Sequence, residues 1–264
     1  MLDSFSGNSY QQKNNLIHLD GSIYIERVSE TSIILRVNEM SGTPDTDSAM
    51  SLQMRNILVR RCLNRIVANG PNWLLDHVVS YDSVLLVFDS LETSFSKVLS
   101  CLNSMVGESS YEQFEPPATL KGQLHKIDVC YALSDENHPN DMALIEASTG
   151  LIACDIIDLH KTTEYQVFAI GFMPNFAYLG TLSPNLKVSR LARPRQAVPA
   201  GAVAIADNQT AVYPSASPGG WHIIGYTAFS FSDDITIAIG PNDKVIFNSI
   251  DKDTYYQQVK RAGN

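Results

Sequence analysis

The sequence has little positive charge. It contains 19 lysines and arginines against 28 aspartates and glutamates, which gives a formal net charge of −9 at pH 7. Proteins that bind nucleic acids or anionic membranes use a basic face to neutralise phosphate groups. The composition therefore argues against nucleic-acid and membrane binding, and it leaves room only for a local basic patch.

Cysteines are few and widely spaced. The four thiols belong to Cys62, Cys101, Cys130 and Cys154, and no two of them have the C-x-x-C spacing. This pattern predicts neither a zinc site nor a disulfide framework. We expect reduced thiols in a protein core.

Targeting and membrane-spanning segments are missing as well. The opening residues, MLDSFSGNSYQQKNNLIHLD, combine neither a basic start nor an apolar run. No later stretch approaches the roughly 20 apolar residues of a membrane span. We expect a cytoplasmic protein that begins with a loosely ordered polar extension over residues 1–20.

The common catalytic motifs are absent. The sequence contains no G-x-x-x-x-G-K-[ST], G-x-G-x-x-G, G-x-S-x-G or H-E-x-x-H, and its six histidines lack metal-ligand spacing. These absences argue against a phosphate loop, a dinucleotide site and a metal site. We expect this chain alone to bind no cofactor and no metal.

The pattern of apolar residues in the first part of the sequence indicates an α+β domain over residues 21–110. Alternating apolar runs at 23–28 and 32–37 predict a hairpin, and apolar positions at helical spacing predict a helix over 47–68. Two short strands on either side of Tyr81 and a helix over 91–107 repeat this order. Such units favour an antiparallel sheet with both helices on one face. The apolar stripes of these helices are typical of a core.

A second domain is expected over residues 124–264, after a proline-containing linker at 111–123. The sequence predicts a strand at 125–133, two short helices at 139–150 and 153–161, and a strand at 164–172. Short apolar runs separated by glycine and proline turns then occur at 202–206, 210–213, 221–226, 235–239 and 244–250. Many short strands with such turns favour a barrel or a sandwich.

The stretch from Tyr165 to Ala206 contains no acidic residue, although the chain as a whole is acidic. It carries four cations, which are Lys187, Arg190, Arg193 and Arg195. Proline fixes the backbone between the last two, and residues two apart in an extended segment share a face. Arg193 and Arg195 are therefore candidates for binding one carboxylate or phosphate. The alternatives are a solvated basic loop and a docking patch for an acidic partner.

Two further segments carry candidate ligand contacts. GFMPNFAYLG places Phe172, Phe176 and Tyr178 at even spacing, so the rings would line a ligand site or lie in a core beneath a loop. SASPGGWHIIGY places Gly219 and Gly220 before a tryptophan. Paired glycines expose backbone N–H groups, as anion sites require, but they also make ordinary tight turns.

Three motifs in order carry a resemblance. They are G-F-x-P-x-F-A-Y-L-G, then R-x-x-x-P-R-x-x-V-P-A-G-x-V-A-I-A, then Q-T-x-V-Y-P-x-x-S-P-G-G-W-x-I-I-G. The chain resembles the family of the 5-oxoprolinase B subunit, which includes sporulation-kinase inhibitors, allophanate hydrolase subunit 1 proteins and the carboxyltransferase domain, subdomains C and D. The match is strongest over residues 160–227.

The resemblance implies an N-terminal α+β domain followed by a cyclophilin-like β-barrel. It also implies partners, the C and A subunits of 5-oxoprolinase, and the ATP-dependent opening of 5-oxo-L-proline to L-glutamate. A lactam is a poor electrophile, so its oxygen would be phosphorylated before water attacks. Because this chain has no phosphate loop, we expect the partner complex to handle ATP.

The family's motif positions supply the expected site. The resemblance suggests His160 for proton transfer, because an imidazole titrates near neutral pH. Contacts to a small carboxylate or amide ligand are expected from Phe172, Pro174, Phe176, Tyr178, Arg190, Arg193, Arg195, Pro199, Gly201, Gln209, Tyr213, Ser217, Pro218, Gly219, Gly220 and Trp221.

Several positions depart from the family pattern. Tyr226 stands where members have the arginine of G-R-T-P, and the Y-G-G-x-x-G-P-D-L region reads YALSDENHPNDM from Tyr131. These departures keep two alternatives open. One is a non-catalytic inhibitor of a sensor histidine kinase, and the other is a component of an enzyme that processes allophanate or urea amides.

Overall fold

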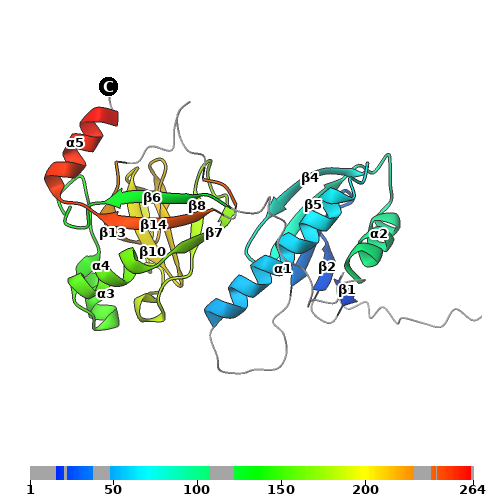
Figure 1. Ribbon diagram of the computed structural model, residues 1–264, viewed down its shortest axis with the longest axis horizontal. Coiled ribbons are helices and arrows are strands. Elements are labelled where there is room, and N and C mark those ends of the chain that lie inside the picture. Colours follow the sequence, from blue (N-terminus) through cyan, green and yellow to red (C-terminus); the bar gives the residue numbers. More distant parts are fainter. Residues whose placement is uncertain are drawn as a thin grey trace, which may run out of the picture. The chain divides into compact units, whose positions relative to one another are not determined.

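The structure is a computed structural model that describes residues 16–20, 23–37, 48–107, 122–228, 239–241 and 243–262. The chain divides into two compact units, Met1–Pro117 and Ala118–Asn264, and each is described by itself (Figure 1). The predicted extension up to residue 15, nearly all of the predicted linker at 111–123 and the predicted run at 235–238 lie outside the described residues.

The first unit contains a five-stranded sheet in which all neighbouring strands are antiparallel. Side by side, the strands are β1 (Leu16–Asp20), β2 (Ile23–Arg27), β3 (Ser32–Val37), β5 (Ser83–Phe88) and β4 (Leu74–Val79). Burial alternates along β3, as expected for a sheet with one covered face. The predicted β2–β3 hairpin is confirmed.

Two helices, α1 (Ser48–Ala68) and α2 (Phe95–Gly107), cover the same face of this sheet (Figure 1). Every second residue of β3 enters the core that they enclose, beginning with Ile33 and Leu35. The helices contribute Leu58, Val59, Cys62, Leu63, Ile66, Val98 and Leu102. The predicted antiparallel sheet with two helices is confirmed, and Cys62 lies in its core.

The second unit is a nearly closed barrel. Its seven strands lie in the order β13 (His222–Tyr226), β10 (Ala202–Ala206), β11 (Gln209–Val212), β8 (Ala177–Gly180), β7 (Tyr165–Ile170), β14 (Lys244–Ser249) and β6 (Leu124–Val129). Paired backbone hydrogen bonds between Cys130 and Tyr226 bring the end of β6 to β13. The predicted barrel is thereby confirmed.

Alternating residues separate the two faces of this sheet. In β10, Val203 and Ile205 join a core that also contains residues of α3 (Met142–Thr149) and α4 (Ala153–Thr162). The alanines of β10 face the other way, toward a cluster that we call the aromatic face. It contains Phe176, Tyr213, Trp221, Tyr226 and Tyr255, the last from α5 (Lys252–Ala262).

Six elements were not predicted from the sequence. They are β1, β8, a two-stranded ribbon of β9 (Arg195–Val198) and β12 (Ser217–Gly219), a short 3-10 helix at Pro184–Leu186, and α5. The ribbon carries three of the expected site residues in β12 and one in β9. These expected residues therefore lie in paired strands rather than in a loop.

Candidate functional site

The aromatic residues of the first motif gather on the aromatic face. A tight turn precedes β8, because Phe176 donates its backbone N–H to Met173 and Gly171 donates to Phe176. The Phe176 ring then meets the rings of Phe172, Tyr178, Tyr213 and Trp221 edge-on, at centroid distances of 5.3, 4.8, 5.2 and 6.0 Å. Edge-to-face pairs of this kind stabilise a rigid cluster.

Phe172 stands apart within this group because 63% of its surface is exposed. Its φ is +71°, and Asn175 in the same turn has φ +64°. Left-handed conformations of residues other than glycine cost about 1–3 kcal/mol and cluster at ligand-binding turns. Pro174 between them is also exposed. The turn therefore presents one aromatic ring to the outside of the cluster.

Arg195 and Gly219 face each other across the β9–β12 ribbon. A Cβ on Gly219 would lie 2.4 Å from the Tyr213 hydroxyl and 3.0 Å from Val198. Only glycine therefore lets the ribbon approach the phenol this closely. Ser217 and Pro218 precede Gly219 in β12 and are half-buried and exposed, respectively.

The Tyr213 phenol lies within the electrostatic reach of two arginines. Burial is the largest effect on this group and raises its pKa to about 12, whereas the charges of Arg190 and Arg195 lower that pKa. The hydroxyl therefore remains a hydrogen-bond donor at neutral pH. Burial also raises the pKa of Tyr178, against the charge of Arg190. Both tyrosines thus lie near Arg190.

The backbone on both sides of Arg190 is fixed. His222 Nε2 lies 3.0 Å from the Ser189 carbonyl, and the Leu191 N–H donates to Gly220 at 2.7 Å. The Arg190 side chain itself is 63% exposed and lies 3.7 Å from the Asp207 carboxylate. Arg190 therefore has a backbone held by hydrogen bonds and an exposed guanidinium group.

The pairing of Arg193 with Arg195 stays a prediction. β9 begins only at Arg195, while Arg193 and Lys187 lie in exposed loop positions. Arg190 and Arg195 both act electrostatically on the Tyr213 phenol. The spacing argument assumes an extended backbone on both sides of Pro194, whereas β9 begins directly after this proline.

Three other expected residues belong to a turn beside the barrel or to the start of a barrel strand. Gly201 has φ +78°, and a Cβ there would lie 2.5 Å from the Thr227 carbonyl oxygen. Pro199 accepts the Ala202 N–H in the same turn. Gln209 opens β11 and pairs with Gly180 of β8. These contacts support structural roles for the turn and for the start of β11.

His160 lies in the other core. Its side chain is fully buried, Nδ1 lies 2.8 Å from the Tyr131 hydroxyl, and Nε2 lies 2.9 Å from the Thr210 hydroxyl. Thr210 donates its single proton to the Ala204 carbonyl, so it accepts from Nε2–H of a neutral imidazole. Burial lowers the pKa of His160 to about 3. This geometry favours a structural role over proton transfer.

Sequence reasoning missed Asp141, which is 4% exposed. Its Oδ1 accepts from Arg195 Nη2 at 2.5 Å, and its Oδ2 accepts from the Ile223 N–H at 2.7 Å. The residue stands in the departed YALSDENHPNDM segment, two positions after a proline. The family pattern G-P-D-L was the available signal, but the segment reads HPNDM here.

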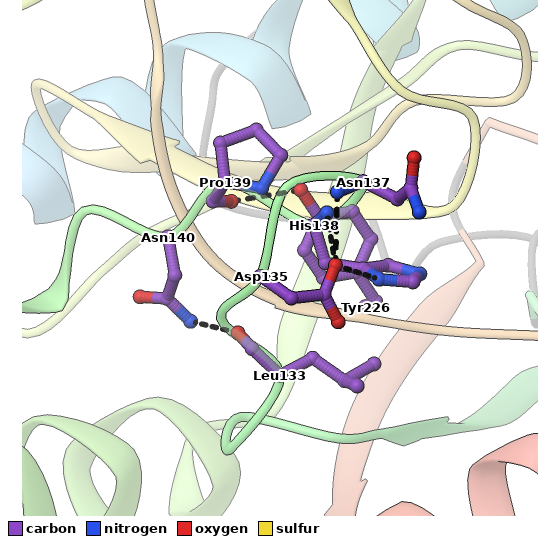
Figure 2. A network of polar contacts seen from close by, with 7 residues as sticks. All are labelled: Leu133, Asp135, Asn137, His138, Pro139, Asn140 and Tyr226. Carbon is purple, nitrogen blue, oxygen red and sulfur yellow. Dashed lines mark hydrogen bonds and ion pairs between the residues drawn. The ribbon is translucent and has the colours of Figure 1, made fainter.

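A polar network fixes the loop that leads to Asp141 (Figure 2). Asp135 Oδ1 accepts from the N–H groups of Asn137 and His138 and lies 2.9 Å from His138 Nδ1, a contact that lowers the Asp135 pKa. Asn140 donates to the Leu133 carbonyl, and Tyr226 donates to the Pro139 carbonyl. The loop is therefore held to β13 through Tyr226 and braced internally by Asp135 and Asn140.

Within the described part of the chain, no group of three or more His, Cys, Asp or Glu side chains is arranged to hold a metal ion. The described helices also include none that is long and apolar enough to cross a membrane.

Comparisons with known proteins give close relatives for part of the chain. It is 46% identical over 110 residues to the B subunit of 5-oxoprolinase from Escherichia coli O157:H7, covering 40% of this chain and 50% of that protein. It is 36% identical over 149 residues to the B subunit of 5-oxoprolinase from Haemophilus influenzae, covering 56% and 66%. The matches thus span less than two thirds of these relatives.

The fold is similar to part of the Kluyveromyces lactis urea carboxylase crystal structure, with a TM-score of 0.69 and 15% identity over 95% of this chain and 24% of that one. Residues 24–236 match the family described as "Carboxyltransferase domain, subdomain C and D". That match covers well over half of the sequence. The chain therefore belongs to the carboxyltransferase domain, subdomain C and D, family.

Proposed function

We propose that this chain is the B subunit of an ATP-dependent 5-oxoprolinase and helps to open 5-oxo-L-proline to L-glutamate together with the A and C subunits. The observation that carries the proposal is the 46% identity to the B subunit of the Escherichia coli 5-oxoprolinase. The arrangement of Arg190, Arg195 and Tyr213 beside Gly219 supports it, because a small cyclic amide with a carboxylate needs cations and neutral donors together.

The chemistry assigns the difficult step to the carbonyl carbon. An amide carbonyl is a weak electrophile, and phosphorylation of its oxygen by ATP makes the carbon open to attack by water. The ring C–N bond then breaks as the nitrogen takes up a proton, and a second water releases phosphate from the resulting acyl phosphate. The sequence of this chain contains no phosphate loop. We assign ATP to the partner proteins, and substrate orientation to the aromatic face of this one.

Residue roles follow from the contacts. Arg190, with its exposed head, binds the substrate carboxylate. Half-buried Tyr178 and exposed Phe172 contact the ring of the substrate, and the buried rings of Phe176 and Trp221 hold these two in place. We assign no proton transfer to His160, since both of its nitrogens are engaged inside the core.

The test is glutamate release from 5-oxoproline and ATP by the A and C subunits, with and without this chain. We expect release only when the chain is present. If those two partners work equally well without it, the proposal fails. In that case, autophosphorylation of cognate histidine kinases and binding of allophanate or urea become the next measurements, because they test the two alternatives.

A further inference from the structure

Asp141 occupies a helix N-cap position without capping its helix. It directly precedes α3, where an aspartate side chain ordinarily accepts an N–H of the first turn. Its side chain makes no such bond, and Asn140 Oδ1 accepts the Met142 N–H instead. Both Asp141 oxygens are committed elsewhere, to Arg195 and to Ile223.

This commitment fixes the Arg195 guanidinium. Nη2 is held by a carboxylate that is itself 4% exposed and hydrogen-bonded to β13. Nη1 is buried and has no hydrogen-bond partner among the described residues. A buried guanidinium N–H without an acceptor costs free energy, so such a group is expected to meet an acceptor when the site is in use.

The ion pair also removes the net charge. Arg195 and Asp141 together are neutral, whereas Arg190 has only an exposed carboxylate at 3.7 Å. A neutral pair attracts an anion weakly, but its oriented N–H still binds an uncharged carbonyl oxygen. The two arginines of the site are therefore suited to different ligand groups.

We propose that Asp141 is a specificity-determining positioning residue: it neutralises and orients the Arg195 guanidinium, so that this guanidinium binds the uncharged carbonyl oxygen of an amide. Arg190 is left to bind the carboxylate. The inference rests on the proposed function for the location of the ligand, and it goes further by dividing the ligand groups between the two arginines.

The experiment measures binding of three probes to the full chain by NMR titration. The probes are 5-oxo-L-proline, pyrrolidin-2-one, which lacks the carboxylate, and cyclopentanecarboxylate, which lacks the amide. Asp141→Asn keeps the side-chain shape and removes the charge. It is expected to weaken pyrrolidin-2-one binding about tenfold or more and to strengthen cyclopentanecarboxylate binding severalfold. A purely structural loss would weaken both probes together.

A second set of variants covers the case in which Asp141→Asn does not fold, since an unpaired Arg195 is destabilising. The double variant Asp141→Asn with Arg195→Gln keeps a neutral hydrogen-bonded pair. It is expected to lose pyrrolidin-2-one and to retain cyclopentanecarboxylate at the wild-type affinity. Arg190→Gln is expected to do the reverse. Asp207→Asn is the matched control, because it removes the exposed carboxylate beside Arg190 and leaves pyrrolidin-2-one binding unchanged.

Three results would overturn the inference. They are no binding of any probe to the wild-type chain, unchanged pyrrolidin-2-one affinity in the double variant, and parallel changes of both single-group probes. Its failure is distinguishable from that of the proposed function. If the chain is required for glutamate release but the variants affect pyrrolidin-2-one and cyclopentanecarboxylate binding alike, only the division of ligand groups between Arg190 and Arg195 is refuted. If the variants affect the two single-group probes in opposite ways but the chain is not required for glutamate release, only the proposed role as a 5-oxoprolinase subunit is refuted.

Discussion

His160 is the side chain whose burial has the clearest consequence for pH dependence. Its pKa is lowered from 6.5 to about 3 by burial. Between pH 3 and pH 6.5, His160 is therefore protonated in the unfolded chain and neutral in the folded chain. The stability that the neutral imidazole contributes is complete above pH 6.5 and decreases as the pH falls toward 3. At most about 1.4 kcal/mol is lost per pH unit from this group.

The prediction is that His160→Gln destabilises the fold by about 1–3 kcal/mol at pH 7, through lost hydrogen bonds to Tyr131 and Thr210. The difference from wild type should shrink at pH 5, since the variant lacks the titrating group. Urea unfolding at both pH values measures this. His77→Gln, at an exposed strand position, is the control and should follow wild type at both. If the free energies of unfolding of wild type and His160→Gln differ equally at pH 7 and pH 5, the lowered pKa of His160 is contradicted.

Gly219 offers a second test at the residue scale. An alanine Cβ there would meet the Tyr213 hydroxyl at 2.4 Å, so Gly219→Ala should displace the phenol and weaken 5-oxo-L-proline binding about tenfold or more. The neighbouring Gly220→Ala adds a Cβ with only ordinary contacts, the nearest being Pro194 at 3.6 Å. It should leave thermal stability and the position of Tyr213 unchanged. Titration with 5-oxo-L-proline and thermal unfolding of both variants test this. Equal affinities of Gly219→Ala and Gly220→Ala for the ligand would contradict the prediction.

The residues of the site were predictable to different degrees. Arg190, Arg195, Tyr213 and the glycines stand in ordered motifs, which a sequence displays directly. Asp141 lies 54 positions before Arg195, and a buried ion pair between distant segments has no local pattern. The acid-free stretch was therefore correctly seen as basic, but the carboxylate that neutralises one of its arginines comes from outside it.

At the scale of elements, alternation and helical spacing predicted the first unit well. Apolar residues recur at every second position in β2 and β3, and at helical spacing in α1 and α2, because each element buries one face. The ribbon of β9 and β12 has no such pattern, since prolines, glycines and arginines occupy it and it buries mainly Val198. Its pairing is set by tertiary contacts.

Helix α5 was missed for a related reason. It is largely polar, and Tyr255 is its one buried side chain among those described, at 6% exposure. Tyr255 lies against His138, with ring centroids 5.9 Å apart, and joins the aromatic face with Tyr226. A single buried anchor in an otherwise polar segment gives little apolar signal to read from the sequence.

The element-scale prediction concerns this anchor. Tyr255→Ala should destabilise the barrel by about 3–5 kcal/mol, because it removes a buried aromatic ring from the aromatic face. Tyr256→Ala should cost less than about 1 kcal/mol, since that neighbouring ring is 48% exposed. Chemical unfolding of the two single variants gives a matched comparison. Similar losses in both would mean that α5 does not depend on Tyr255.

At the scale of the whole molecule, the two units have separate cores. One core lies between the five-stranded sheet and its two helices, and the barrel has its own pair of clusters. Every expected ligand contact and Asp141 belong to the second unit, Ala118–Asn264. A domain with its own core is able to fold alone, so the barrel should carry the ligand site without the first unit.

A fragment of residues 118–264 should therefore fold cooperatively and bind 5-oxo-L-proline within about threefold of the full chain, because an intact core keeps Arg190, Arg195 and Tyr213 in place. The fragment of residues 1–117 should fold without binding it. Calorimetry and NMR titration of both fragments test this, with the Gly219→Ala form of the barrel fragment as the negative control. A barrel fragment that folds but does not bind, beside a full chain that does, would place part of the ligand site in the first unit.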